Sequence, residues 1–547
     1  MPDLDRAFQQ TVEFGRYQKF CVALLCFQTC IQDCFSAFAW VFFLYTPQHK
    51  CRIPNELAQN YSSNNISLVG EQCSIKVQTN SGEILDHLPC NNGWDYSGGV
   101  FDDSLISRWD LVCDRAIYAK TSLAFSGAAT IVGCLVLSWI QDKFGRKVAF
   151  FVSVFLYTSG SIVSLFMPTL LTFTLIRCIA SVTIVNSWNA GYIWAQEMIG
   201  PSKRTLISTI FCVVYATTAV FIGLLAYACQ HWKSFGLVTS LPLLIQFSFH
   251  FFLLESPRWL IGNKQPEKAA AVFKKIMKRN GITLTDQEVE KLLAQDDHEI
   301  AKKTPKSTVV DLFRGYQLRW KTIIMTWVWI GNSLVYYAIA FNMENLGGNF
   351  YVMYMLQAAM EAPANLLVLA IVGKVGRIFV LFFSMIVAGL CCLLTAVPNL
   401  PIPIVLLLAL VGKLGICCSF VTIAQVACEL YPTVVRGVGN GFTSFVGELS
   451  KVIMPYVIHT ATIHSSLPMI IMGALTVLCG CTSMLLPEPL KLHMAESLHE
   501  AEIHGKIGVP AVRSHWKRLR TMQCMAITAD DEKDDVIERL NINSKDT

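Results

Sequence analysis

The sequence has little charge for a chain of 547 residues. Asp, Glu, Lys and Arg together make up 15% of it, whereas 53% is hydrophobic. A soluble protein of this length would not carry so apolar a composition, so we expect the chain in a lipid bilayer. The sequence also lacks the alternating ten-residue segments of a transmembrane barrel, which leaves membrane-spanning helices. We therefore predict an all-α membrane protein.

Motifs for chemistry on a bound group are missing as well. No spacing of cysteines and histidines resembles a metal site, and no phosphate-binding loop or nucleophile motif is present. We predict no enzyme activity, no cofactor and no ATP-driven pumping. The excess of Lys and Arg over Asp and Glu, 44 against 39, is small, so a nucleic-acid partner is not expected. Residues 1–18 are polar and acidic, unlike a cleavable signal peptide.

What the sequence does have is a series of long apolar runs. Each is about 20 residues, the length that crosses roughly 30 Å of hydrocarbon as a helix. We predict twelve spans, in two groups of six, at 20–45, 116–140, 148–168, 170–197, 206–228, 235–254, 321–343, 349–372, 378–397, 402–429, 437–461 and 466–487.

The basic residues set the orientation of these spans. The polar segment 46–115 is poor in Lys and Arg, whereas 263–321 holds thirteen. Because loops rich in positive charge stay in the cytosol, the first segment lies outside and both termini lie inside. The predicted order is a cytosolic N-terminus, a bundle, a cytosolic linker, a second bundle and a disordered cytosolic tail, at 1–19, 20–254, 255–320, 321–487 and 488–547.

The predicted outer loop contains the features of an extracellular segment. Four cysteines in it would form two disulfides in an oxidising compartment, and the sequence alone allows three pairings of Cys51, Cys73, Cys90 and Cys113. The chain's two N-x-S/T acceptors, Asn60 and Asn65, also lie here, which predicts glycosylation.

Charged motifs recur in the two halves at nearly one offset. "DKFGRK" and "GKVGRI" begin 373 − 142 = 231 residues apart, "EMIGPSKR" and "ELYPTVVR" 429 − 197 = 232, and "ESPRWL" and "EPLKL" 488 − 255 = 233. Two parallel six-helix repeats joined by a long cytosolic segment are typical of a major facilitator transporter, with its ligand between the halves at mid-membrane.

We place these motifs at the cytosolic face. Their charges would pair across the halves as a gate, or alternatively anchor the turns in the lipid headgroups. The residues concerned are Asp142, Gly145, Arg146, Glu197, Arg204, Glu255, Arg258, Glu429 and Arg436.

The motifs also carry a family resemblance. "SWIQDKFGRK", "ESPRWLI", "ELYPTVVRGVG" and the large first outer loop ending "WDLVCDR" resemble the organic cation, anion and carnitine transporters, solute carrier family 22. The resemblance covers about residues 10–490. It implies pairing of Cys51 with Cys90 and of Cys73 with Cys113. Gly373 replaces the family's acid in the second copy of the first motif, so a weaker inner lock is expected in that half.

Two charges three residues apart, Glu448 and Lys451, interrupt the eleventh span. Glu448 lies twelve residues after Arg436, a little over three helical turns, which places it near mid-membrane. An ionisable group at that depth normally faces water or a partner. The resemblance implies that an acid here selects cations, and the nearby ammonium would suit a zwitterion. The alternative is an ion pair that only fastens the helix.

Aromatic residues complete the predicted pocket, since ring faces attract ammonium groups. By the resemblance, Trp188, Trp329, Tyr336 and Phe420 line it and Asn332 offers a hydrogen bond. Lys413 would line it or pair with an acid, and Asp33 is a candidate second cation contact. We expect Arg177 and Glu361 to make helix contacts.

These features predict a monomeric plasma-membrane transporter of small organic cations or zwitterions, carnitine-like or quaternary, working by alternating access. One alternative is an organic-anion or urate exchanger of the same family, in which the lysines dominate. An alternative of another class is a receptor or scaffold that does not transport.

Overall fold

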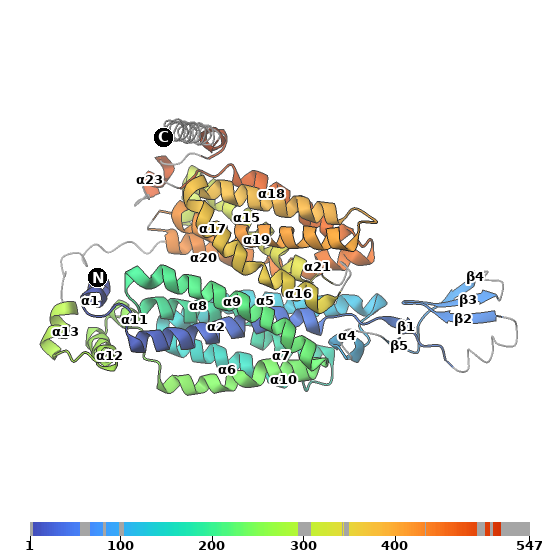
Figure 1. Ribbon diagram of the computed structural model, residues 1–547, viewed down its shortest axis with the longest axis horizontal. Coiled ribbons are helices and arrows are strands. Elements are labelled where there is room, and N and C mark those ends of the chain that lie inside the picture. The colour runs from blue at the N-terminus through green and yellow to red at the C-terminus, as the bar shows by residue number, and fades with distance from the viewer. Residues whose placement is uncertain are drawn as a thin grey trace, which may run out of the picture.

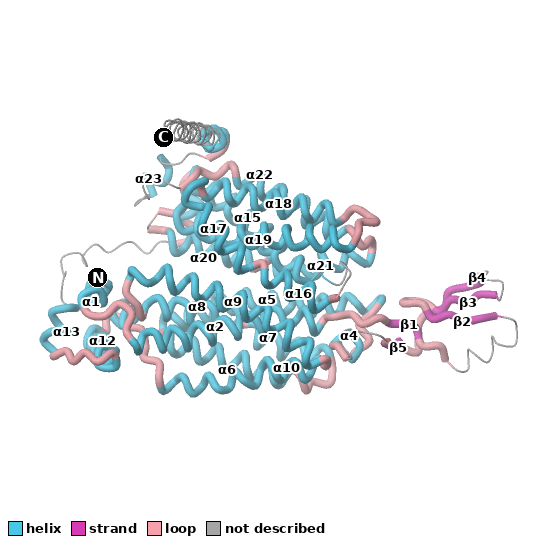
Figure 2. Tube along the Cα trace, viewed as in Figure 1, coloured by secondary structure: helices cyan, strands magenta, loops and turns pink. Residues whose placement is uncertain are grey.

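The computed structural model describes residues 4–54, 66–79, 84–97, 103–293, 308–341, 343, 349–432, 434–489, 498–503 and 507–515. Asn60 and Asn65, the predicted glycosylation acceptors, lie outside these ranges. Two helical bundles lie side by side, with strands projecting beyond one end and short helices gathered at the other (Figures 1 and 2). We call the strand end the outer end and the opposite one the inner end.

Helices account for both bundles. The first half consists of α2 Arg16–Phe43, α5 Ala116–Phe144, α6 Arg146–Ser164, α7 Leu170–Ser181, α8 Ile184–Glu197, α9 Arg204–Cys229, α10 Trp232–Ser240 and the 3₁₀ helix Leu241–Phe251. The second half consists of α15 Tyr316–Phe341, α16 Phe350–Ala359, α17 Glu361–Val375, α18 Arg377–Thr395, α19 Ile402–Leu430, α20 Arg436–Gly447, α21 Ser450–His459 and α22 Leu467–Ser483.

Length and hydropathy agree with membrane spans. Within the described ranges, ten helical segments are long and apolar enough to cross a bilayer, and α22 is a shorter apolar helix. Each begins and ends within several residues of a predicted span. The remaining predicted span, 437–461, corresponds to α20 and α21, which are 12 and 10 residues long and are not among these segments.

Divided helices are a feature that the sequence analysis missed. It predicted continuous spans, but the fourth is interrupted at Val182–Thr183, the eighth at Met360 and the eleventh at Glu448–Leu449. A change from α-helical to tighter hydrogen bonding in mid-helix is often found at functional hinges.

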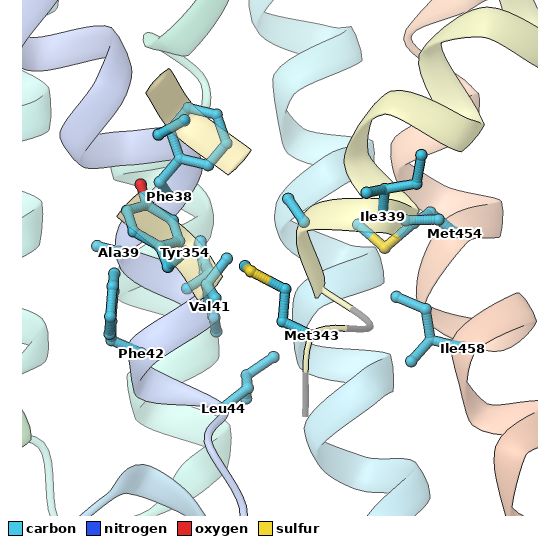
Figure 3. Close-up of a cluster of buried hydrophobic side chains, with 14 of the residues drawn as sticks. Phe38, Ala39, Val41, Phe42, Leu44, Ile339, Met343, Tyr354, Met454 and Ile458 are labelled. Atoms are coloured by element: carbon cyan, nitrogen blue, oxygen red, sulfur yellow. The ribbon is translucent and has the colours of Figure 1, made fainter. Parts of the chain in front are cut away.

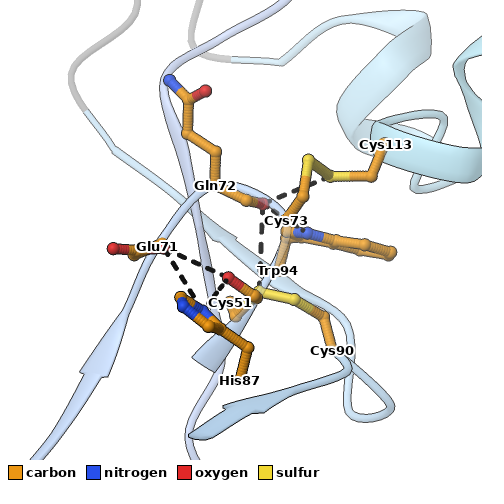
Figure 4. Close-up of a disulfide and its surroundings, with 9 residues drawn as sticks. Cys51, Glu71, Gln72, Cys73, His87, Cys90, Trp94 and Cys113 are labelled. Atoms are coloured by element: carbon orange, nitrogen blue, oxygen red, sulfur yellow. Dashed lines mark hydrogen bonds and ion pairs between the residues drawn. A yellow bond between two sulfur atoms is a disulfide. The ribbon is translucent and has the colours of Figure 1, made fainter. Parts of the chain in front are cut away.

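The outer loop departs from the all-α prediction. Two small antiparallel sheets form here, one from β1 His49–Cys51 with β5 Trp94–Tyr96, the other from β2 Ile66–Gly70, β3 Ile75–Thr79 and β4 Ile84–Leu88. Disulfides join Cys51 to Cys90 and Cys73 to Cys113, the pairing that the resemblance implies (Figure 4). The Trp94 indole donates to the Gln72 carbonyl at 3.0 Å beside them. The cross-links compensate for the small apolar core of these sheets.

Short helices close the inner end of each half separately. α1 Leu4–Gln10, α12 Pro266–Arg279 and α13 Asp286–Leu293 pack on the first half through Phe8 and Phe273, whose ring centroids are 5.4 Å apart. α23 Leu498–Ile503 docks on the second half, where Glu502 accepts hydrogen bonds from the first-turn amides of α15. The segment of the tail on which the expectation of disorder rests, 517–535, lies outside the described residues.

The halves are packed together mainly toward the outer end. One buried apolar cluster there combines Phe38, Val41 and Phe42 of α2 with Met343, Tyr354 of α16, and Met454 and Ile458 of α21 (Figure 3). Toward the inner end, the buried clusters of described residues each belong to a single half. The two halves therefore share a buried apolar cluster at the outer end and have separate cores at the inner end.

Candidate functional site

Glu448 lies at the break in the eleventh span. Its amide is shared between the Ser444 and Phe445 carbonyls, and the Lys451 amide bonds back to the Glu448 carbonyl, so the turn is tighter than an α-helix. Pro455, inside α21, cannot donate a backbone hydrogen bond to the preceding turn. The predicted mid-span acid therefore stands at a tight, 3₁₀-like turn between α20 and α21.

The Glu448 carboxylate forms an ion pair with Lys451, at 2.6 Å between Oε2 and Nζ. Both side chains keep some accessible surface, 21% and 15%, and the Lys451 ammonium lies 4.9 Å from the ring centroid of Tyr337 on α15. The predicted pair is thus formed, and its charges compensate each other within one helix segment.

A second, deeper pair joins Glu361, the first residue of α17, to Lys413 of α19. Their Oε1 and Nζ atoms are 3.7 Å apart and the side chains are 9% and 2% exposed. The Tyr336 hydroxyl donates to Glu361, and the Lys413 ammonium lies 3.6 Å from the Tyr336 ring centroid. Of the two roles left open for Lys413, the structure therefore shows pairing with an acid.

Asp33 is the third carboxylate of this region, just past the middle of α2. It interacts electrostatically with Lys451, Glu448 and Glu361 of the opposite half. Among the described residues its carboxylate has no ion pair and no hydrogen bond, and the residue is partly exposed. We call Asp33, Glu361, Glu448, Lys413 and Lys451 the central cluster.

Aromatic rings form one group in each half. In the second half, Phe420 contacts Trp329 and Tyr336, at centroid distances of 5.5 and 5.2 Å. In the first half, Trp188 packs against Tyr215, at 5.5 Å. The structure thus groups the predicted residues of α15 and α19, whereas Trp188 belongs to a separate aromatic group of α8 and α9.

Asn332 lies on the same helix face as Trp329 and Tyr336 and is fully buried. Its Oδ1 accepts a hydrogen bond from Ser419, but its Nδ2 and the Trp329 Nε1 have no partner. Two hydrogen-bond donors are therefore left unpaired beside the rings.

The charged motif at the inner end of the first half forms one network. Arg146 pairs with Asp142 at 3.0 Å and with Glu197 at 3.1 Å, and Glu255 accepts from the backbone amides of Arg146 and Lys147. Burial raises the pKa of the Glu255 carboxyl, while these amides act in the opposite direction.

The second half repeats this network in reduced form. Arg377 pairs with Glu429 at 2.6 Å, and Glu488 accepts from the amides of Arg377 and Ile378 at 2.9 and 3.0 Å. Each of these motif pairs lies inside one half, and none of them links the two halves in this conformation.

Sequence reasoning missed Asp5 entirely. This residue of α1 binds two predicted motif residues, Arg204 at 2.5 Å and Arg258. An acid on a short polar N-terminal helix gives no signal of this role, because its partners lie 199 and 253 residues away.

Comparison with known proteins gives consistent results. The model of a family described as "Sugar (and other) transporter" matches residues 103–497. A "Beta-alanine transporter" of Drosophila melanogaster is 30% identical, covering 91% of this chain and 89% of that protein. An "Organic cation transporter protein" of the same species is 32% identical, covering 91% and 94%, and the human "Organic cation/carnitine transporter 2" is 26% identical, covering 91% and 94%.

Solved structures agree on the fold. The inward-open xylose transporter XylE from E. coli superposes with a TM-score of 0.60 at 13% identity, covering 89% of this chain and 100% of that one. At this identity the likeness shows the major facilitator fold alone.

Proposed function

The chain belongs to solute carrier family 22 of the major facilitator superfamily, and from that premise we propose a plasma-membrane carrier of small organic cations or zwitterions that works by alternating access. Its two termini lie in the cytosol and it acts as a monomer.

The observation that carries this proposal is the central cluster. Each charge at mid-membrane costs at least about 2.5 to 3.5 kcal/mol on insertion scales, so five of them between two bundles need a function or a set of partners. Three carboxylates and aromatic rings from both halves form a suitable environment for a positively charged group.

The packing of the halves supports alternating access. The outer ends share one apolar cluster, and a Cβ on Gly127 of α5 would lie 3.0 Å from the Lys451 backbone, so α5 and α21 leave no room between them. The inner ends have separate cores and separate ion networks. A substrate would reach the central cluster from the cytosolic side in this conformation.

The membrane potential is a sufficient driving force for a cation. It is worth roughly 2.3 kcal/mol per charge per 100 mV, so uptake needs no bound fuel. An exchange of organic anions fits less well, because Lys451 and Lys413 are each paired with a carboxylate that an anion would have to displace.

The test is uptake of labelled tetraethylammonium, carnitine, β-alanine and urate by cells that express the chain. We expect saturable uptake of at least one cation or zwitterion. Glu448→Gln should lower kcat/KM for it at least tenfold, because Lys451 then faces the site without its counter-charge. Asp86→Asn, the same chemical change on exposed strand β4, is the control.

Surface biotinylation separates transport from trafficking in both variants. Saturable uptake of urate alone would support the anion exchanger instead. An absence of saturable uptake of all four compounds, with the protein at the surface, would favour the receptor or scaffold.

A further inference from the structure

The central cluster contains one more negative charge than positive charge. Its two lysines are used in the pairs Glu448–Lys451 and Glu361–Lys413, and both pairs lie within the second half. Asp33, from the first half, is the carboxylate that remains. Arg177, a buried cation of α7, lies over the Trp40 and Phe43 rings, further toward the outer end of α2.

Asp33 differs from the other two acids in its partners. Tyr336 donates to Glu361, which also pairs with Lys413, and Lys451 forms an ion pair with Glu448, whereas no described side chain or amide pairs with or donates to the Asp33 carboxylate. An ionised carboxylate offers several acceptor sites and is strongly stabilised by charged N–H donors. What the residue lacks is a donor with a positive charge.

On α15, in the opposite half, two donors lack an acceptor. Among the described residues, the Nδ2 of Asn332 and the Nε1 of Trp329 have no hydrogen-bond partner, in side chains that are 0% and 7% exposed. Buried donors of this kind are normally satisfied by a protein group, water or ligand. A ligand that carries an ammonium group at one end and an oxygen acceptor at the other would complement both sides.

We propose that Asp33 is the residue that binds the substrate's ammonium group, and that the preferred substrates are amines that still bear N–H groups, such as amino acids and amino alcohols. This inference rests on the proposed function and narrows it. A quaternary ammonium cannot donate the hydrogen bonds that Asp33 lacks, and binds through rings and charge alone.

The experiment uses two pairs of compounds that differ only in N-methylation: ethanolamine and choline, and β-alanine and its trimethyl betaine. Wild-type uptake should favour the N–H member of each pair. Asp33→Asn should raise KM for ethanolamine and β-alanine at least tenfold and for the methylated partners by less than threefold. Asp33→Glu should recover part of the loss.

A second measurement guards against misfolding. Purified Asp33→Asn protein should keep the wild-type melting temperature, but the stabilisation by 10 mM ethanolamine seen in the wild type should disappear. Asp86→Asn should behave as wild type in both assays.

Three outcomes would overturn the inference while leaving the proposed function in place. The first is equal KM changes for methylated and unmethylated compounds. The second is unchanged kinetics in Asp33→Asn with a loss in Glu448→Gln. The third is a loss of the pH dependence of uptake alone, which would make Asp33 a proton site. If the wild type carries and binds none of these four compounds but takes up tetraethylammonium or carnitine, the inference fails and the proposed function stands. If it takes up no cation or zwitterion of either set, both proposals fail.

Discussion

The two halves are alike at the inner face and unlike at the centre. Gly145 and Gly376 have nearly the same backbone angles, φ +106° and ψ 163° against φ +112° and ψ 153°, and each is followed by an arginine whose amide is bound by a distant glutamate. At the centre, by contrast, the second half supplies four charges and the first half only Asp33.

This difference shows which parts of the duplicated unit are held constant. The glycine turn and the carboxylate that caps the next helix recur in both halves. The glycine permits the positive φ of the turn, and the carboxylate accepts hydrogen bonds from the first amides of the helix. The exposed acid at 142 has become glycine at 373, since a surface ion pair adds little stability. The charges of the central cluster are not tied to a backbone turn in this way, so the halves are free to differ there.

The largest expected effect comes from breaking the shared turn. Gly145→Val and Gly376→Val each place a branched side chain at φ above +100°, which alone costs on the order of 1–3 kcal/mol. The side chain also pushes into Glu255 or Glu488, and the two amides that this carboxylate binds then lose their partner, at about 1–3 kcal/mol each. We expect little folded protein at the cell surface for either variant, measured by surface labelling and size-exclusion chromatography.

Gly373→Ala is the matched control, because a Cβ there meets no atom within 4 Å and the position is helical. It should express as wild type or better. Should Gly376→Val fold normally while Gly145→Val does not, the turn would not be a shared structural requirement.

The next largest effect is expected from removing one charge of the buried pair Glu361–Lys413 in the second half. Lys413→Met leaves Glu361 as a buried unpaired charge, and breaking such a pair costs about 3–5 kcal/mol. We expect a marked fall in melting temperature and in uptake. The double variant Lys413→Met/Glu361→Gln should recover most of the thermal stability, because no unpaired charge remains.

Lys143→Met serves as the control for this series. The Lys143 ammonium lies 4.6 Å from the Trp139 ring centroid on the exposed end of α5, so its loss should change stability by no more than about 1 kcal/mol. A double variant as unstable as Lys413→Met alone would show that the pair's polarity, and not its charge balance, is needed.

The smallest effect is expected from restoring the acid that the first half has at Asp142 and the second half lacks at Gly373. Gly373→Asp restores the i,i+4 partner of Arg377 that Asp142 provides for Arg146, and should add about 0.3–0.5 kcal/mol relative to Gly373→Asn. The expected difference in melting temperature is about 1 °C or less. An equal melting temperature for the two variants would mean that this pair contributes nothing to stability.

Features that depend on neighbouring residues could be predicted from the sequence. Apolar runs of membrane length gave the spans, and the glycine and charge spacing of "DKFGRK" and "GKVGRI" gave the repeat. Glu448 and Lys451 were identified as a pair because residues three apart share a helix face. The strands β2, β3 and β4 were missed, because five-residue segments in a polar loop carry a weak signal.

Features that depend on tertiary contacts could not be predicted. Glu361 and Lys413 are 413 − 361 = 52 residues apart, and only helix packing brings them to 3.7 Å. Asp33 is left unpaired because Lys413 and Lys451 pair with the other two acids of the central cluster. Which acid each lysine reaches depends on side-chain rotamers and on the positions of the helices. The break at Met360, by contrast, had a sequence signal that was not used, because Pro363 has no N–H to bond the Ala359 carbonyl.

The apolar cluster between the outer ends of the bundles can act as the point about which one bundle rotates relative to the other. α2 has 28 residues and is thus about 42 Å long, so a swing of about 10° around contacts at its outer end moves the inner end by about 7 Å. That distance is comparable to the width of a small organic ion. In the proposed alternating access, a small sliding movement between apolar side chains at the outer end therefore produces a much larger opening at the inner end.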